Sequence, residues 1–355
     1  MFGVFEMSDG LNFSCPFPIQ DYPTVQMAHG GGGRFMRQLL EEMFVPAFSN
    51  KYLDEEHDGA VFDASSGRMA FSTDSYVVDP LFFAGGDIGS LAVNGTVNDL
   101  AMCGARAAYL SAGFILEEGF SMGKLEKIVS SMRRAAGEAN VKIVTGDTKV
   151  VQKGRGDGIY INTAGIGFVD EDTQISPTRI EPGDLLILSG DVARHGMAVM
   201  AGREGLEFES EIKSDCAPLV EPVYELLKES IDIHCLRDLT RGGLASVANE
   251  LADGCGLGFK IKEAQVPLHE DVESACEILG FDPFYVACEG CMLLVVPKTE
   301  AEETLSILKK HEQCKESAVV GEALSEHPGK VELITRIGTA RSLDLLSGEQ
   351  LPRIC

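Results

Sequence analysis

Four aspartates in this sequence have surroundings in which a carboxylate can hold a metal ion and a phosphate: Asp74, Asp99, Asp147 and Asp238. Each comes at or soon after a segment that we interpret as a strand ending in a loop. Ligand sites in α/β proteins form where strands end, and Mg²⁺ takes oxygen ligands from one or two carboxylates, from phosphates and from water. We therefore predict that the four carboxylates converge on a metal-bound nucleotide. For each residue alone, a role as turn former or helix cap stays open.

A run of glycines follows His29 and leads into a predicted helix; its members are Gly30, Gly31, Gly32 and Gly33. Backbone amides in such a run, together with the N-terminus of the next helix, can bind phosphate, and the freedom of the run lets it close as a lid. The usual nucleotide-binding patterns, the Walker A loop and Gly-x-Gly-x-x-Gly, are both missing. A flexible linker is an equally good interpretation of a glycine run.

The last residue, Cys355, is a thiol at the end of a segment whose patterning fades from about Gly338. Pro352 discourages regular structure just before it. About fifteen residues at roughly 3.3 Å each can sweep tens of ångströms, so such an arm can carry a group between sites. Arg353 favours the thiolate, although the terminal carboxylate opposes it. Prenylation is not indicated, because that signal places the cysteine four residues from the end. A tail cysteine without a role remains the alternative.

Strand and helix patterns alternate through the whole chain and predict two α/β domains. In the first half, strands are expected at 61–63, 69–72, 107–116, 141–145 and 159–169, and helices at 87–102 and after Ser121. In the second half, strands are expected at 185–189, 257–261, 292–296, 319–322 and 331–334, and helices at 194–203, 219–229 and 244–254. A turn signal at 181–184 separates the halves. We predict a poorly ordered extension over 1–28, domains over 29–180 and 181–337, and a mobile tail over 338–355.

Composition restricts the classes of function. The formal net charge is −25, and no Lys/Arg stripe offsets it, so nucleic acid is excluded as a partner. No apolar run approaches the roughly 18 residues that span a membrane, and the N-terminus lacks the basic region of a targeting peptide. We therefore expect a cytoplasmic protein whose ten cysteines are reduced thiols.

Several segments together resemble one family, the hydrogenase maturation factors called HypE. They are Phe71-Ser-Thr-Asp-Ser-Tyr-Val-Val78, Phe82-Phe-Ala-Gly-Gly-Asp-Ile-Gly89, Gly95-Thr-Val-Asn-Asp-Leu-Ala-Met102, Gly146-Asp-Thr-Lys-Val-Val151, Ser189-Gly-Asp-Val-Ala-Arg-His-Gly-Met197, Arg237-Asp-Leu-Thr-Arg-Gly-Gly243, Ala287-Cys-Glu-Gly290 and Pro352-Arg-Ile-Cys355. The resemblance runs from about His29 to the last residue, and the ending is its most specific element. The internal motifs are also similar to aminoimidazole ribonucleotide synthetases, selenophosphate synthetases and thiamine-phosphate kinases.

The resemblance implies a fold and a ligand. The fold is a two-domain aminoimidazole ribonucleotide synthetase-like fold, α/β (α+β), whose N-terminal sheet domain dimerises and whose C-terminal domain is α/β. ATP with Mg²⁺ would bind between the domains. Carried over by motif, Asp74, Asp99, Asp147 and Asp238 would be metal and phosphate ligands, Asn98 and Thr148 would assist them, and the glycine run after His29 would be the phosphate lid.

The resemblance also implies a reaction, an ATP-dependent dehydration by a carbon–oxygen lyase. A carbamoyltransferase, HypF, would load a carboxamide onto Cys355, and ATP would phosphorylate the carboxamide oxygen. Loss of phosphate would leave a thiocyanate, whose cyanide reaches the iron of [NiFe] hydrogenase through the HypC–HypD complex. We hypothesise Glu289 as the base, because its place beside the apolar segment at 291–296 favours a raised pKa. Lys149 would polarise the amide or neutralise phosphate. A solvated loop glutamate and a surface lysine are the alternatives.

Three other interpretations remain. A selenophosphate synthetase or small-molecule kinase of the same superfamily is one, although the reactive cysteine of the former lies near the glycine loop, whereas Cys15 lies well upstream. A non-catalytic carrier that binds ATP as a switch is the second. The third is a thiol-redox protein built on Cys288 and Cys291, but no thioredoxin-like context surrounds this Cys-x-x-Cys and no second pair exists for zinc. We expect these two cysteines to lie in the core near the site.

Overall fold

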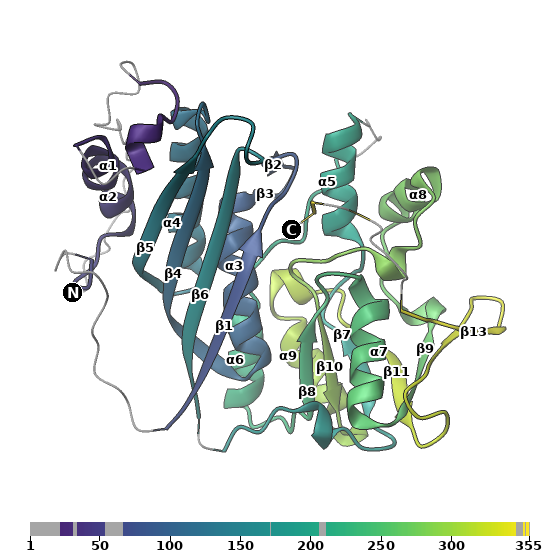
Figure 1. Ribbon diagram of the computed structural model, residues 1–355. Coiled ribbons are helices and arrows are strands. Elements are labelled where there is room, and N and C mark those ends of the chain that lie inside the picture. Colours follow the sequence, from purple (N-terminus) through teal and green to yellow (C-terminus); the bar gives the residue numbers. More distant parts are fainter. Residues whose placement is uncertain are drawn as a thin grey trace, which may run out of the picture.

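The computed structural model describes residues 22–30, 34–53, 67–170, 172–205, 211–345, 351, 353 and 354. Two sheets stand side by side, and each carries packed helices (Figure 1). The predicted two-domain α/β architecture is therefore confirmed, while the strand expected at 61–63 lies outside the described residues. Within the described ranges, no helix is both long enough and apolar enough to cross a membrane.

The N-terminal half is built on a four-stranded sheet in the order β1-β6-β4-β5. The strands are β1 (Arg68–Tyr76), β4 (Ala105–Glu117), β5 (Lys142–Val151) and β6 (Ile159–Val169). Neighbouring strands are antiparallel except β4 and β5, which are parallel and are joined by the crossover helix α4 (Met122–Glu138). α4 and α3 (Ile88–Met102) cover one face of the sheet (Figure 1). We call the other face, which no described helix covers, the open face.

The sequence of α4 explains both its start and its orientation. The Ser121 side chain accepts a hydrogen bond from the backbone N–H of Lys124, which caps the first turn. Leu125, Ile128 and Met132 recur at helical spacing and are fully buried in the core of the N-terminal half. The helix predicted after Ser121 is confirmed, and it carries the chain back across the covered face so that β5 can pair with β4.

The C-terminal half contains a seven-stranded sheet in the order β13-β12-β9-β11-β7-β10-β8. Its strands are β7 (Leu185–Leu188), β8 (Cys235–Asp238), β9 (Gly258–Lys262), β10 (Met292–Val296), β11 (Ala318–Leu324), β12 (Val331–Ile334) and β13 (Ala340–Ser342). Its helices are α5 (Arg194–Glu204), α6 (Val220–Lys228), α7 (Gly243–Cys255), α8 (Glu270–Leu279) and α9 (Ala301–Leu308). Every residue of β10 is buried, which explains its unbroken apolar sequence.

Short elements complete the fold. Along the β5 side of the first sheet lie η1 (Met27–Gly30), α1 (Arg34–Leu39), η2 (Leu40–Phe44) and α2 (Val45–Phe48). β2 (Phe82–Phe83) and β3 (Gly86–Asp87) precede α3. Single 3₁₀ turns are η3 (Pro177–Arg179), η4 (Glu263–Gln265), η5 (Pro283–Tyr285), η6 (Lys298–Glu300) and η7 (Glu312–Cys314).

Two expectations about the chain ends need correction. In the predicted extension, the segment at 22–28 is packed rather than poorly ordered: the Val25 N–H donates to the Phe120 carbonyl at 2.6 Å, and the Gly119 N–H donates to the Val25 carbonyl at 2.7 Å. Prolines hide strand-like pairing here because they disrupt any periodic pattern. The irregular chain expected from 338 is wrong for Ala340–Ser342, which pairs with β12 as β13. Polar, exposed edge strands of three residues leave no sequence period to detect.

Candidate active site

Only one of the four predicted metal-binding aspartates lies at the end of a strand. Asp238 is the last residue of β8, whereas Asp74 lies within β1, Asp147 within β5 and Asp99 within α3. The prediction of strand ends is therefore wrong for three of them. At Asp147 the reason is Gly146, which does not turn the chain: its missing side chain lets the carbonyl of the neighbouring strand approach closely while β5 continues.

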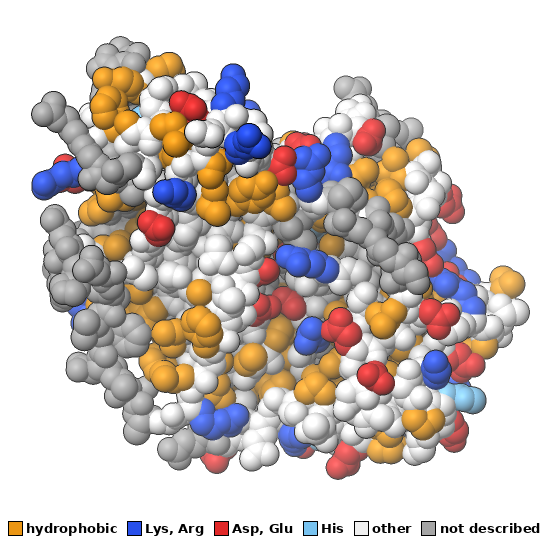
Figure 2. Space-filling view, in the orientation of Figure 1, with side chains coloured by type: hydrophobic (Ala, Val, Ile, Leu, Met, Phe, Trp, Pro, Cys, Tyr) orange, Lys and Arg blue, Asp and Glu red, His pale blue; other side chains and the backbone are white. Residues whose placement is uncertain are grey.

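Asp74, Asp99 and Asp238 nevertheless converge between the two halves of the molecule, and we call them the acid cluster. Burial raises the pKa of Asp99, and the charge of Asp74 raises it further. Burial raises the pKa of Asp238 to about 7, and the charge of Asp99 is the next contribution. They meet because α3 packs both on β1 and against β8, so that residues far apart in the sequence share one site. Figure 2 shows acidic and basic side chains in the groove between the halves.

One carboxylate oxygen of the acid cluster indicates that a cation binds there. The Ser72 hydroxyl donates to Asp99 at 2.6 Å, and Arg241 lies 3.5 Å from Asp74. By contrast, Asp238 Oδ2 is buried and has no hydrogen-bond partner among the described residues. A buried carboxylate oxygen without a donor, next to two other carboxylates, is costly unless a positive ion neutralises it. An all-oxygen donor set is also what Mg²⁺ prefers, so the residues present fit a magnesium ion.

Asp147 does not join the acid cluster within one chain. β1 and β5 are opposite edges of the sheet, with β6 and β4 between them. The register places Asp74 opposite Thr163, Thr163 opposite Ala112, and Ala112 opposite Gly146, in one row across the sheet. Adjacent strands lie about 4.8 Å apart, so three spacings separate the backbones of the two edges by roughly 14 Å.

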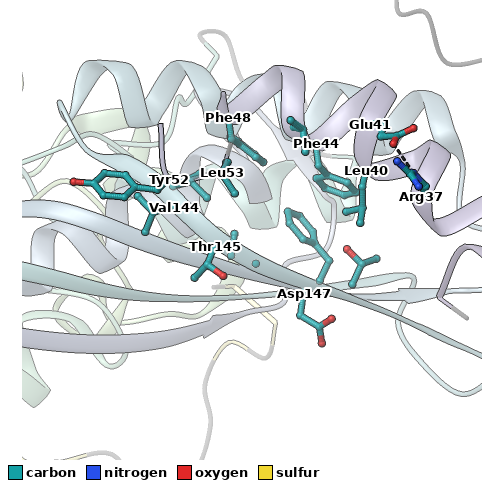
Figure 3. A pocket seen from close by; sticks show the side chains of 16 residues that line it. Arg37, Leu40, Glu41, Phe44, Phe48, Tyr52, Leu53, Val144, Thr145 and Asp147 are labelled. Atoms are coloured by element: carbon teal, nitrogen blue, oxygen red, sulfur yellow. Dashed lines mark hydrogen bonds and ion pairs between the residues drawn. The ribbon is translucent and has the colours of Figure 1, made fainter. Parts of the chain in front are cut away.

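The side chain of Asp147 also leaves from the other face of the sheet. Thr163 and Ala112 are buried on the covered face, and Asp147 follows one residue after Gly146, so it projects from the open face. Figure 3 shows its carboxylate pointing away from the residues of α1, η2 and α2. Lys149 is exposed two residues further on the same face, whereas Thr148 is buried on the covered face. The predicted site residues on β5 are therefore separate from the acid cluster.

A cavity of about 920 Å³ lies between β5, β4 and the helices η2 and α2. Phe44, Phe48 and Tyr52 form an aromatic wall, and Asp147 lies on the strand side (Figure 3). Thr148 of β5 also lines the cavity. The cavity thus adjoins the β5 site residues and contains no member of the acid cluster.

Glu289 is buried between the two halves, with 3% of its surface exposed, so it is not a solvated loop residue. Its backbone N–H and that of Gly290 donate to Asp215 Oδ2 at 3.1 and 2.9 Å. Its carbonyl accepts from Asn98 Nδ2 at 3.4 Å. Burial raises the pKa of Tyr76, and the charges of Asp74, Glu289 and Asp99 raise it further, so Glu289 and two members of the acid cluster share Tyr76 as a neighbour.

Asn98 uses its side chain on the backbone of the second half. Its Nδ2 also donates to the Ala217 carbonyl at 3.1 Å, and its Oδ1 accepts from the Leu219 N–H at 2.7 Å. All three bonds join α3 to segments that lead to Glu289 and α6. In this structure Asn98 therefore positions backbone instead of presenting a free ligand atom.

The start of the glycine run lies against β5. A Cβ at Gly30 would come within 2.6 Å of the Val150 backbone nitrogen, so only glycine fits this approach. The His29 side chain is fully buried, where its Nδ1 accepts from the Gln26 N–H at 2.9 Å and its ring packs edge-on against Tyr22 and Phe35. Burial lowers the pKa of His29. Gly31, Gly32 and Gly33 lie outside the described residues.

Cys355 also lies outside the described residues, but the residue before it is firmly held. Ile354 is 4% exposed and belongs to a hydrophobic cluster to which both halves contribute. Its carbonyl accepts a hydrogen bond from His195 Nε2 at 3.0 Å, and the Arg353 carbonyl accepts from Arg203 at 2.8 Å and from the Asp79 N–H at 3.2 Å. The chain before Cys355 is therefore docked between α5 and the N-terminal half, which the fading sequence pattern did not predict.

Sequence reasoning missed four residues that shape this site: Ser72, Tyr76, Ser214 and Asp215. Asp215 stands among mixed polar residues with no period or motif to mark it.

Cys288 and Cys291 are buried free thiols, as expected. Burial raises the pKa of both, so the thiolates that redox exchange needs are disfavoured.

Comparison with known proteins gives the context of this site. Residues 56–169 match the family model of the N-terminal domain of AIR synthase related proteins, and residues 181–334 match that of the C-terminal domain. The chain is 49% identical to carbamoyl dehydratase HypE of Azotobacter vinelandii over 332 residues, which is 94% of this chain and 97% of the relative.

Two solved structures are also similar. One is a hydrogenase maturation protein HypE in complex with ATP, with a TM-score of 0.91, 45% identity, and coverage of 94% of this chain and all of that one. The other is the HypE–HypF complex, with a TM-score of 0.76, 46% identity, and coverage of 87% of this chain and 99% of that one.

Proposed function

The chain belongs to the carbamoyl dehydratase HypE family, and from this premise we propose that it uses ATP to dehydrate a carboxamide carried on its own Cys355. The product would be a thiocyanate that supplies the cyanide ligands of hydrogenase iron. The observation that carries the proposal is the docking of Ile354 in the same interdomain region that contains the acid cluster and Glu289. Such docking supports the proposal because it holds the residue before Cys355 at the interface of the two halves, where the phosphoryl transfer would take place.

The reaction would proceed in two balanced steps. In the first, the carboxamide oxygen attacks the terminal phosphorus of ATP, ADP leaves, and one N–H proton is lost, which gives an O-phosphorylated imidate on sulfur. In the second, a base removes the remaining N–H proton, the freed electron pair forms the third carbon–nitrogen bond, and the carbon–oxygen bond breaks as phosphate leaves. Phosphorylation is needed because oxide is a very poor leaving group.

Asp74, Asp99 and Asp238 would hold Mg²⁺, whose chemistry there is to neutralise the charge of the transferred phosphoryl group. Support comes from the buried Asp238 oxygen without a donor and from the mutual proximity of the three acids. Phosphoryl transfer depends mainly on positioning and charge, so this role requires no further reactive side chain.

Glu289 would be the base of the second step. Its burial beside the acid cluster, and the anchoring of its backbone by Asp215 and Asn98, support this assignment. A general base must be held within reach of its proton, and a glutamate fixed at both its N–H and its carbonyl meets that demand. Asn98 would serve as a positioning residue.

Asp147 and Lys149 would act on the site of a second copy of the chain, which makes the protein a homodimer, whereas Thr148, buried on the covered face, would act only by positioning β5. They cannot join the acid cluster of their own chain, because they lie across the sheet from it. The open face carries exposed apolar side chains, among them Met69, Phe71 and Ile115, and Figure 2 shows hydrophobic residues spread over this side of the N-terminal half. Two open faces packed about a twofold axis would bring β5 of one copy toward β1 of the other.

The partners follow from the reaction. The related HypE crystallised with HypF supports a HypF carbamoyltransferase as the source of the carboxamide. A HypC–HypD complex as the acceptor, His29 and the glycine run as a phosphate lid, and the cytoplasm as the location remain predictions.

Intact-mass analysis would test the proposal. With carbamoyltransferase, carbamoyl phosphate and ATP, the last peptide should gain one carboxamide and then lose one water only when ATP is present. A Cys355→Ala variant should do neither. A carboxamide that stays on Cys355 while ATP is bound but not cleaved would identify a non-catalytic carrier instead.

A further inference from the structure

We infer that His195, Ser214 and Asp215 are positioning residues that link the docked C-terminal tail to the backbone of Glu289. This inference rests on the proposed function, because it explains how thiol and base would be aligned. Hydrogen bonds join the Ile354 carbonyl through His195 to Ser214, and the covalently adjacent Asp215 accepts from the backbone N–H of Glu289, so one short segment between α5 and α6 contacts both.

The hydrogen bond to the Ile354 carbonyl determines which ring nitrogen of His195 carries the hydrogen. The Ile354 carbonyl can only accept, so His195 Nε2, at 3.0 Å, carries the hydrogen. His195 Nδ1 lies 2.8 Å from Ser214 Oγ and, in the neutral ring, accepts the serine hydroxyl. Ser214 Oγ in turn accepts the Cys216 N–H at 3.0 Å. His195 is fully buried, and burial lowers its pKa to about 4, which agrees with the neutral form.

Asp215, the residue after Ser214, makes the contact with the backbone of Glu289. Asp215 Oδ2 accepts from the N–H groups of both Glu289 and Gly290. The two segments touch closely, because a Cβ at Gly290 would overlap the Asp215 carbonyl. Asn98 clamps the same pair from α3, with bonds to the carbonyls of Ala217 and Glu289. A shift of Ser214 would therefore be passed on to the backbone of Glu289 through Asp215.

The carbonyl that His195 binds belongs to the Ile354–Cys355 peptide bond. Its occupation by a buried donor should shield that bond from carboxypeptidase, and this gives a measurement that needs neither ATP nor a carboxamide. His195→Gln is a matched control, because its Nε2 stands as many bonds from Cβ as that of histidine. His195→Asn instead reaches only the Nδ1 position, so it keeps the contact to Ser214 and loses the donor to the tail.

The experiment measures release of Cys355 by carboxypeptidase in the full-length protein, followed by intact mass. We expect His195→Asn to release Cys355 roughly five- to tenfold faster than the unaltered chain, the effect of one lost buried hydrogen bond, and His195→Gln to remain close to the unaltered rate. Asp215→Ala should also speed release, since the segment is continuous, whereas Asp215→Asn should not. Ser214→Ala provides a milder second variant should His195→Asn fold poorly.

Single-turnover dehydration of the carbamoylated protein supplies the second measurement. His195→Asn and Asp215→Ala should slow this step at saturating ATP without changing the ATP concentration that half-saturates it. Equal release rates in all variants would overturn the inference, and so would Asp215→Ala that slows dehydration while leaving the tail protected. If the unaltered chain performs no dehydration, the proposed function fails, yet the carboxypeptidase result still decides whether the link exists.

Discussion

The acid cluster and the β5 edge differ in how much of the site one chain can complete. Asp238 and Glu289 are buried between the two halves, and Asp99 beside them is half-buried and accepts a hydrogen bond from Ser72. Asp147 and Lys149 are exposed on the open face, on the far side of the sheet from Asp74. In the proposed function, the first region would hold both the cation and the base within one chain, whereas the second would need a partner site.

This contrast separates two sources of positioning. In the interdomain region, α3 and the segment at 214–217 fix the reactive groups within one chain. At the β5 edge, the strand fixes the direction of each side chain but provides nothing for it to act on. In the proposed homodimer, a second copy packed through the open face would supply that target and would also cover the apolar residues there.

The largest effect is expected at Glu289. A Glu289→Gln variant keeps the size and the backbone anchors of the residue but cannot accept a proton, so dehydration should fall by roughly 10² to 10⁴. ATP binding should be unchanged, because the acid cluster is intact. Single-turnover mass analysis of the carbamoylated chain measures the first quantity and equilibrium nucleotide binding the second. Normal turnover in this variant would remove Glu289 from the reaction and leave the interdomain region as a nucleotide site alone.

The next effect concerns the open face. Phe71 is 70% exposed, so a charge there costs the isolated fold little. If the open faces pair, Phe71→Asp buries a charge in the interface, and dimer affinity should weaken by at least about thirtyfold, corresponding to about 2 kcal/mol. Sedimentation across a concentration series measures this, with Phe71→Leu as the control that keeps the face apolar. A variant that stays as associated and as active as the unaltered chain would contradict pairing through this face.

Mixed dimers test which copy Asp147 serves. Asp147→Asn and Asp238→Asn should each abolish activity. In an equal mixture, half of the dimers carry one of each, and each of these has one site with neither change, so about a quarter of full activity should return. As a control, each variant taken alone through the same mixing procedure should regain no activity. If the mixed sample also stays inactive, although mixed dimers form, Asp147 and Asp238 belong to one chain's site.

Elements with a regular hydrophobic pattern could be predicted from the sequence, whereas contacts that depend on single residues could not. Elements with a clear period, such as α4 and β10, were placed to within a few residues because burial of one stripe or a whole strand determines their pattern. Asp238 was correctly placed at the end of a strand. Asp99 was grouped with the strand ends, although it lies within the helix that the sequence correctly predicted over 87–102. The docking of Ile354 left no pattern at all, since it depends on single hydrogen bonds from His195 and Arg203.

The smallest effect is a pH dependence confined to the tail side of the interdomain region. Burial lowers the pKa of His195 from its ordinary 6.5 to about 4, and its contacts are neutral: Ser214, the Ile354 carbonyl and the edge of Phe83. Between these two pKa values the unfolded chain binds a proton that the folded chain does not, so His195 reduces stability as the pH falls from about 6.5 to about 4 and changes nothing below that.

At pH 5 the reduction should be about 2 kcal/mol relative to pH 7.5. Asp238 acts in the opposite direction, because its raised pKa makes the folded chain bind a proton first. The comparison of unaltered and His195→Gln chains by urea unfolding at both pH values isolates the histidine, since Asp238 is common to both. The glutamine variant should lose less stability on acidification, by about that amount. Equal losses would mean that His195 is protonated in the folded chain, and its bond to the tail would then not depend on the neutral ring.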